Sequence, residues 1–532
     1  MKGIRKMKKK QITAAALICM LAAAGCGNKG SETVTGNIDF KDYPIQTDDK
    51  LTYYVQLNSN VAAVSENLGT TPFAEELMKE TGVNVEFIHP PIGQESEQLN
   101  IVLASDDLPD IIETNWYGFS GGPSKALSDG FIMKLNDLIE SDSPNLKKYL
   151  SEHQDIDKNL KTDDNEYYAY PFIRGDEKLL VSRGIIIRQD WLDELGLEMP
   201  ETLDEWHNVL TQFKEKKGVQ SPLSYQDGMF KDGEFIGAYG ITSDFTVENG
   251  KVIYGPYDER YKDFLAEFAK WYKEGLIDQN IASVDGKSLN ANILNGRTGA
   301  TFGFAGSGLG TWLKALNEKD AKANLTAAPH VAAKKGEKPK LGAYDMQYTG
   351  IGGAAITTSC KNPSLAARFL DFGYSEKGNK LYNFGIEGES YNMVDNYPTY
   401  TDIILKNPDG LAVGAAMGQY IRANQMGPFV QDKEYIEQYY AIPQQQEALD
   451  IWGNSDMKSY QLPQITFTSE ESSEIASIKN NVKTYVDEST IKFITGIDDL
   501  SKYDEYVSNL KSFGADRMLE IYQAAYDRYM KR

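Results

Sequence analysis

The residues best suited to ligand chemistry are aromatic side chains in loops that are rich in glycine and polar residues. Trp116 and Tyr117 lie in such a loop, directly after the apolar run 111–112. An aromatic face packs against the apolar C–H face of a sugar ring, and the polar tip of the side chain can form a hydrogen bond. Because open α/β sheets bind ligands at the carboxyl ends of their strands, this position favours ligand binding over the alternative, a buried anchor of the loop.

Other aromatic and polar side chains occupy comparable positions. Phe304 closes an expected strand over 298–304, and Trp312 lies in the first turn of the helix after a glycine-rich stretch, where it can face either a cleft or the core. Glycines before a helix also suggest a phosphate loop, but no lysine follows in the Walker arrangement. The additional candidate ligand-binding residues are Arg174, Phe304, Trp312, Tyr344, Asp345, Tyr348, Glu389, Tyr391 and Trp452.

Signals for catalysis are weak. The four histidines are scattered without a His-x-x-x-His pair for a metal, and no Gly-x-Ser-x-Gly elbow is present. Carboxylates are plentiful, so a glycosidase pair is not excluded by counting, but nothing singles out two of them. We therefore expect no catalytic residue, no cofactor and no metal ligand, with an exported carbohydrate-active enzyme as the alternative.

The N-terminus has the layout of an export signal. Six basic residues and no acidic residue occur in the first ten positions, and an apolar run too short to span a bilayer follows at 12–24. The small residues 22–25 before Cys26 resemble the lipobox of bacterial lipoproteins, in which the cysteine thiol is diacylated and becomes the new N-terminus. We predict a signal peptide over 1–25, lipidation at Cys26, a flexible tether over 26–48 and a place on the extracellular face of the cell membrane. The alternative is an ordinary secretory signal with an incidental cysteine.

Charge and cysteine usage limit the partners. The net charge is -22, and loss of six of the 55 basic residues with the signal leaves 49 against 77 acidic residues, or -28. Such a surface repels nucleic acid and anionic headgroups, so we expect no nucleic-acid partner and membrane association through the lipid alone. Cys19 leaves with the signal and Cys26 is lipidated, so Cys360 has no partner for an intramolecular disulfide. The fold must depend on its hydrophobic core.

Alternating strand and helix signals define a first α/β unit. Strands are expected at 51–57, 83–88 and 108–113, and Thr71 followed by Pro72 marks the start of the first helix between them. This order argues for a parallel sheet with crossover helices.

A second α/β unit follows with the same order. An apolar strand is expected at 184–188, a helix at 190–195 ends at Gly196, and Thr202 with Glu205 forms a capping box that opens the next helix. Two such units without a long flexible linker predict two lobes.

Several segments in this order are similar to family 1 extracellular solute-binding proteins, in the long lipoprotein branch of that family. They are 108–112, 188–197, 271–278, 383–391 and 492–529. The resemblance implies an α/β, two-lobe periplasmic-binding-protein (Venus-flytrap) fold with extra C-terminal helices. Each lobe would be a doubly wound, mostly parallel sheet with flanking helices, and the ligand would lie between the lobes.

On this basis the chain divides into discontinuous lobes. Lobe 1 would comprise 49–172 and about 330–380, and lobe 2 would comprise 173–329 and about 381–490. The remainder, 491–532, would be a C-terminal helical segment.

The resemblance also implies a role. A monomer would capture a solute for an ABC importer and, on closing, present a surface to the permease subunits. We expect a carbohydrate ligand, a neutral oligosaccharide in particular, because the family, the aromatic loops and the acidic charge all favour it. The alternatives are a peptide ligand and a sensor lipoprotein of the same fold.

One departure from the family pattern concerns metal. Relatives in this branch often carry a calcium loop after the helix that corresponds to 203–214. Here the lysine-rich segment 214–218 follows, and calcium needs several hard oxygen ligands around one point. We predict that the calcium site is lost.

Overall fold

The computed structural model describes residues 42–105, 107–226 and 232–532. The expected signal peptide, the lipidation site Cys26 and most of the expected tether lie outside these residues. Within the described ranges, no helix is both long and apolar enough to cross a membrane.

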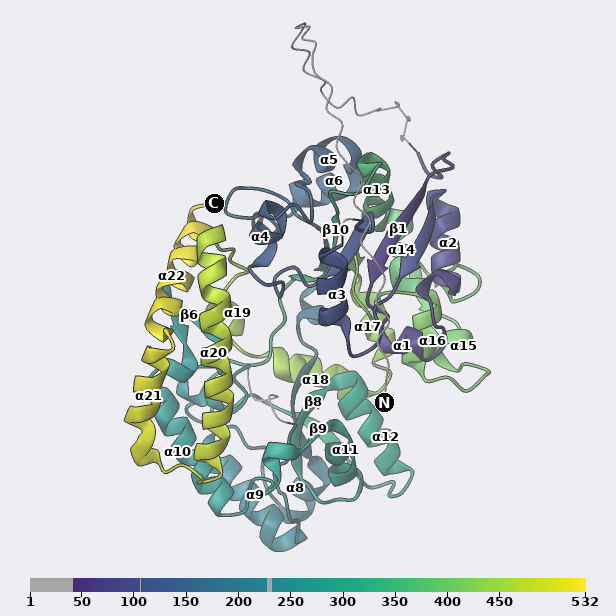
Figure 1. Cartoon of the computed structure of the whole chain (residues 1–532). Helices are drawn as coiled ribbons and strands as arrows, with labels where there is room; N and C mark the ends of the chain where they lie inside the picture. Colours follow the sequence, from purple (N-terminus) through teal and green to yellow (C-terminus); the bar gives the residue numbers. More distant parts are fainter. Residues whose placement is uncertain (1–41, 106, 227–231) are drawn as a thin grey trace, which may run out of the picture. The chain divides into compact units, whose positions relative to one another are not determined.

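The first sheet contains the amino-terminal α/β unit (Figure 1). In the described part of the chain its strand order is β13-β4-β10-β3-β1-β2. β1 pairs in parallel with β2 on one side and β3 on the other, whereas β10 is antiparallel to both β3 and β4. The strands are β1 (Lys50–Val55), β2 (Asn84–Ile88), β3 (Ile111–Thr114), β4 (Tyr170–Arg174), β10 (Tyr348–Ile356) and β13 (Val430–Gln431). The expected α/β class is confirmed.

Local signals determine the first crossover helix, α2 (Pro72–Thr81). The Thr71 hydroxyl accepts a hydrogen bond from the Ala74 N–H, and Pro72 occupies the first turn, where its missing N–H costs nothing. Gly82 ends the helix in the left-handed conformation with φ 74°. A Cβ at Gly82 would lie 2.2 Å from the carbonyl oxygen of Ile45, so the close approach of the preceding chain also requires glycine here.

The boundary expected at about residue 380 differs from the structure. β13 is parallel to β4 in the first sheet, and α14 (Glu376–Phe384) and α16 (Val413–Tyr420) pack against α2. Much of 381–431 therefore accompanies the first sheet, although the sequence predicts it in lobe 2. A two-residue strand such as β13 has no periodic pattern from which its pairing could be predicted.

The second sheet has the order β8-β5-β9, formed by β5 (Arg183–Arg188), β8 (Ala300–Phe304) and β9 (Leu325–Ala328). Both neighbours run antiparallel to β5, so the expectation of a mostly parallel sheet in lobe 2 is wrong for these strands. The central strand is buried over most of its length, and such a continuous apolar run looks the same in either direction of pairing. α8 (Gln189–Leu195) follows β5, and α9 (Leu203–Lys217) begins with the expected Thr202–Glu205 capping box.

The C-terminal helices share a hydrophobic core with the second α/β unit. The long helix α20 (Ser469–Ile494) runs alongside α21 (Tyr503–Ser512) and α22 (Ala515–Lys531), and it also packs against α10 (Arg260–Lys273) (Figure 1). The shared core includes Phe268, Trp271, Val482, Tyr506 and Ile521. Residues 491–532 are therefore part of this core rather than a separate segment.

The remaining elements are connections and covering helices. Up to β8 they are α1 (Ser59–Ala62), α3 (Glu95–Leu103), α4 (Gly122–Ser128), α5 (Asn136–Asp142), α6 (Pro144–Glu152), α7 (Gln154–Asn159), β6 (Phe245–Glu248), β7 (Lys251–Tyr254) and α11 (Gly286–Leu294). After β8 they are α12 (Thr311–Asn317), α13 (Pro363–Asp371), β11 (Tyr391–Val394), β12 (Tyr397–Tyr400), α15 (Asp402–Leu405), α17 (Lys433–Tyr439), α18 (Pro443–Gly453) and α19 (Met457–Tyr460).

Candidate functional site

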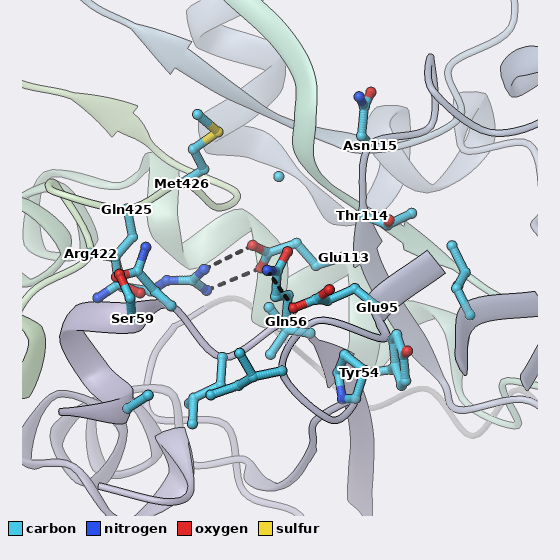
Figure 2. A pocket seen from close by; sticks show the side chains of 18 of the residues that line it. Tyr54, Gln56, Ser59, Glu95, Glu113, Thr114, Asn115, Arg422, Gln425 and Met426 are labelled. Atoms are coloured by element: carbon cyan, nitrogen blue, oxygen red, sulfur yellow. Dashed lines mark hydrogen bonds and ion pairs between the residues drawn. The ribbon is translucent and has the colours of Figure 1, made fainter. Parts of the chain in front are cut away.

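A cavity of about 790 Å³ opens at the carboxyl ends of β1 and β3. The chain passes from β1 to β2 on one side and then crosses to β3 on the other side of β1. The loops after β1 and β3 therefore leave in different directions, and a crevice forms between them. Residues at the ends of these strands line the cavity together with Arg422, Asn424, Gln425 and Met426, which follow α16 (Figure 2).

Side-chain amides form much of the polar lining. A primary amide presents donors and an acceptor in one plane, which suits the hydroxyl groups of a sugar because each hydroxyl both donates and accepts. The amide residues in the lining are Gln56, Asn58, Asn115, Asn424 and Gln425.

The cavity also has an aliphatic side. Ile92 is 71% exposed and lines the cavity with Leu57, Ala62 and Leu99. Together these side chains give one side of the cavity an apolar surface. This surface can cover the C–H face of a ring, although it is not the aromatic surface that the sequence predicted.

A buried ion pair joins the two halves of the lining. The Arg422 guanidinium donates to both oxygens of Glu113, with Nη1–Oε2 and Nη2–Oε1 distances of 3.0 and 2.8 Å. The Tyr53 hydroxyl also donates to Oε2 of Glu113, at 2.6 Å. Burial alone would lower the pKa of Arg422, but the Glu113 carboxylate outweighs it and raises that pKa. The two side chains form a buried salt bridge, in which the opposite charges offset each other.

Three polar atoms of the lining residues lack a hydrogen-bond partner among the residues that the structure describes. They are the Tyr54 hydroxyl, Nε of Arg422 and Oδ1 of Asn424. A buried polar group without a partner costs about 1–3 kcal/mol. These groups therefore leave unmet polar capacity in the residues that line the cavity.

His89 positions the end of β1 beside the cavity. Its Nε2 accepts a hydrogen bond from the Leu68 N–H at 3.1 Å, and its Nδ1 lies 2.8 Å from the Val55 carbonyl oxygen. Burial lowers the pKa of His89, so the neutral ring donates through Nδ1 and accepts through Nε2. His89 therefore holds the backbone at Leu68 and Val55 in place.

The three tryptophans predicted as ligand-binding residues are core residues in the structure. Trp116 and Trp452 have no exposed surface, and Trp312 is 6% exposed. The indole N–H groups of Trp116 and Trp452 donate at 3.1 Å to the carbonyl oxygens of Gly353 and Ile185. Their ring faces are covered by packing, so we correct their assignment. A tryptophan in a glycine-rich loop has the same sequence pattern whether it anchors the loop or binds a ligand.

Arg174 and Asp345 lie together in an ionic cluster at the segments that connect the two sheets. Arg183 donates to Oδ1 of Asp345 at 2.8 Å and pairs with Asp232 at 2.6 Å, while Arg174 lies 3.9 Å from Asp345. Burial would raise the pKa of Asp345, but Arg183 and then Arg174 outweigh it and lower that pKa. These ion pairs stabilise the segments that connect the two sheets, and each charged group in the cluster lies close to a group of opposite charge.

The other predicted residues are dispersed. Tyr344 lines a second hollow, of about 830 Å³, beside Asn454, whereas Tyr348 is buried. Phe304 is 40% exposed at the end of β8, and Tyr117 lines a third hollow next to α20.

Glu389 and Tyr391 lie near the β11–β12 hairpin. Glu389 accepts a hydrogen bond from Tyr420 at 3.0 Å, and Tyr391 is buried. The cavity at β1 and β3 includes none of the eleven predicted ligand-binding residues in its described lining.

No metal centre emerges in the described residues, where no three His, Cys, Asp or Glu side chains come close enough to hold an ion. Two lysines in the last turn of α9 have partners. Lys214 donates to the Glu274 carbonyl, and Lys217 pairs with Glu194 at 2.5 Å. These ammonium groups occupy the region where a calcium loop would need oxygen ligands.

Sequence reasoning missed the residues that line the cavity, but a signal existed for some of them. Gln56 and Asn115 directly follow β1 and β3, where ligand-binding residues are expected in an α/β sheet. The prediction favoured the aromatic neighbour Trp116 over Asn115. Arg422 and Asn424 follow a helix far along the chain, and no local pattern indicates their position.

Comparisons with known proteins identify the family of the chain. The profile of the family described as bacterial extracellular solute-binding protein matches residues 65–380. The fructooligosaccharide ABC transporter substrate-binding protein FusA of Streptococcus pneumoniae is 25% identical over 562 residues, covering 98% of this chain and 99% of FusA. Lipoprotein LipO of Bacillus subtilis is 29% identical over 339 residues, covering 61% of this chain and 65% of LipO.

A solved structure shows the same similarity in three dimensions. The alginate-binding protein AlgQ2, in a crystal structure without calcium ion, superimposes with a TM-score of 0.73 at 26% identity. The match covers 92% of this chain and 100% of AlgQ2. The expected fold is confirmed by this similarity.

Proposed function

We propose, because the chain belongs to the bacterial extracellular solute-binding protein family, that it captures a neutral oligosaccharide and delivers it to the permease of an ABC importer. The observation that carries this proposal is the amide-lined cavity at the carboxyl ends of β1 and β3. Its volume of about 790 Å³ lies within the usual range for small-molecule sites, about 300–1,000 Å³. Its planar amides and its aliphatic side suit the two kinds of surface that a sugar presents.

Capture without chemical conversion fits the lining. In the cavity the carboxylates of Glu113 and Glu95 are both engaged, the first with Arg422 and the second with Gln56 and the Gly93 N–H. A glycosidase would need one carboxyl group free to donate a proton to the glycosidic oxygen. The similarity to FusA, named as an ABC transporter substrate-binding protein, supports the same role here, with the permease subunits as partners.

The site of action would be the outer face of the cell membrane. Cys26 and the small residues before it support a lipid anchor, as does the similarity to a protein named Lipoprotein LipO. A diacylated cysteine holds a protein on the membrane more firmly than a single acyl chain does. We propose that the protein acts there as a monomer.

Calorimetric titration of the mature protein tests the proposal. The panel would contain the neutral saccharides kestose, raffinose and maltotriose, together with trigalacturonate and tripeptides. We expect a neutral saccharide to bind, and we expect Gln56→Ala to weaken that binding about threefold to tenfold, since an exposed hydrogen bond contributes about 0.5–1.5 kcal/mol. Asn454→Ala is the matched control, because this asparagine lies in the second hollow beside Tyr344. This variant should bind the saccharide with the affinity of wild type.

Two results would contradict the proposal. Tight binding of a tripeptide with no response to any saccharide would assign the cavity to peptides. A change in the mass of a bound saccharide after long incubation would indicate an enzyme.

A further inference from the structure

We infer that Glu113 determines the charge class of the ligand: by occupying the Arg422 guanidinium it makes the cavity select uncharged sugar rings and exclude uronates. This inference rests on the proposed function and names a specificity-determining residue for it. Similar proteins differ in the charge of the saccharide for which they are named. FusA is named for fructooligosaccharides, which are neutral, and AlgQ2 is named for alginate, which is a polymer of uronic acids.

The first step is that Arg422 cannot serve as an anion receptor while Glu113 is present. An arginine that recognises a ligand carboxylate uses a pair of parallel N–H donors. In this structure Nη1 and Nη2 of Arg422 both donate to Glu113, and both side chains are 5% exposed. A ligand carboxylate would have to displace a buried carboxylate that Tyr53 also holds at 2.6 Å.

The second step is the charge balance of the whole lining. Among the described residues of the cavity, the only charged side chains are Glu95, Glu113 and Arg422. Glu95 accepts hydrogen bonds from the Gly93 N–H at 2.8 Å and from Gln56 at 3.1 Å, and the Gly93 bond is the main reason that its pKa is lowered. Because Glu113 and Arg422 offset each other in their salt bridge, Glu95 leaves the described lining with one carboxylate in excess. A uronate would meet repulsion that a neutral ring does not meet.

The third step is that the remaining lining residues are suited to neutral groups. The amides and hydroxyls of Gln56, Asn58, Ser59, Asn115 and Gln425 present uncharged donors and acceptors. Two further polar atoms of lining residues, Nε of Arg422 and Oδ1 of Asn424, have no hydrogen-bond partner among the described residues. Discrimination between neutral and acidic rings thus depends on Glu113 and Glu95.

The experiment compares each neutral probe with its charged form. Kestose, raffinose and maltotriose are titrated into the mature protein, and so are their derivatives in which primary alcohols are oxidised to carboxylates. For wild type we expect the neutral form to bind at least tenfold more tightly. Glu113→Gln should leave the guanidinium without a counter-charge and should reduce this ratio about tenfold or reverse it.

Two further variants keep the test decisive if Glu113→Gln folds poorly. Glu95→Gln changes a partly exposed carboxylate and should reduce the ratio about threefold, with a smaller loss of stability than Glu113→Gln. Asp371→Asn is the matched control, because Asp371 pairs with Arg368 in another buried ion pair at 3.7 Å, on α13 and outside the lining of the cavity. It should lower stability without changing the ratio.

The outcomes distinguish this inference from the proposed function. If wild type binds the neutral and oxidised forms equally, or if neither glutamate variant changes the ratio, the inference about Glu113 is wrong while oligosaccharide capture stands. If wild type binds none of the probes in either form, the proposed function fails, and the inference fails with it.

Discussion

Replacing Trp116 by alanine should destabilise the protein rather than remove a ligand contact. The side chain has no exposed surface and packs in a core cluster with Tyr54, Ile112 and Tyr168. Truncation of a buried tryptophan costs about 3–5 kcal/mol. The change also removes the indole N–H that donates to the Gly353 carbonyl at 3.1 Å, which adds about 1 kcal/mol. We expect a total loss of about 5 kcal/mol in the free energy of unfolding.

Urea unfolding followed by circular dichroism measures this loss, and Trp116→Phe is the control. Phenylalanine keeps most of the buried ring but not the donor, so we expect about 1–2 kcal/mol for that variant, the sum of an unmet carbonyl and a small cavity. The reasoning would be refuted if Trp116→Ala unfolded at the wild-type urea concentration and lost affinity for every saccharide. That result would return Trp116 to the ligand-binding surface.

Three other predictions concern pH, the anchor and metal. Burial and then the Asp232 carboxylate raise the pKa of Glu234 to about 8 from 4.5, so the folded state retains a proton that the unfolded state releases, and this contribution to stability is lost as pH rises from 4.5 to 8. Wild-type stability should fall between pH 6.5 and about 8, above the range in which His330 acts in the opposite direction. Glu234→Gln should abolish that decline in thermal unfolding. Burial lowers the pKa of His330 to about 4 from 6.5, which has the opposite sign: its contribution is lost as pH falls from 6.5 to 4, so an unchanged melting temperature in Glu234→Gln over that range would contradict it. Cys26→Ser should move the protein from the membrane fraction to the medium, and retention of the variant in the membrane would disprove lipidation there. The melting temperature should be the same with calcium or with a chelator, and a shift of several degrees would reveal a calcium site.

Local signals were sufficient to predict the starts of helices in both α/β units. The Thr71 cap and the Thr202–Glu205 capping box both act within one turn of helix, so neighbouring residues alone determine them. Pairing over long distances was not predictable in the same way. β13 joins the first sheet through two residues, and the antiparallel neighbours of β5 are not indicated by its apolar run.

The sequence predicted the location of the candidate site but not the residues that line it. The carboxyl end of β3 was the expected location, and Asn115 lies there in the cavity. The aromatic residues selected from the same loop and elsewhere depended on exposure, which only tertiary packing decides. The ion pair between Glu113 and Arg422 joins residues 309 positions apart, and neither residue lies in a pattern that indicates its partner.

The central claim is that a neutral oligosaccharide binds at the carboxyl ends of β1 and β3. A crystal structure of the mature protein with the neutral saccharide that binds in calorimetry tests it most directly. We predict that sugar hydroxyls contact Gln56, Asn115 and Asn424, with Glu113 still paired to Arg422. A sugar bound instead in the hollow beside Tyr344 and Asn454, with the amide-lined cavity free of sugar, would contradict the claim.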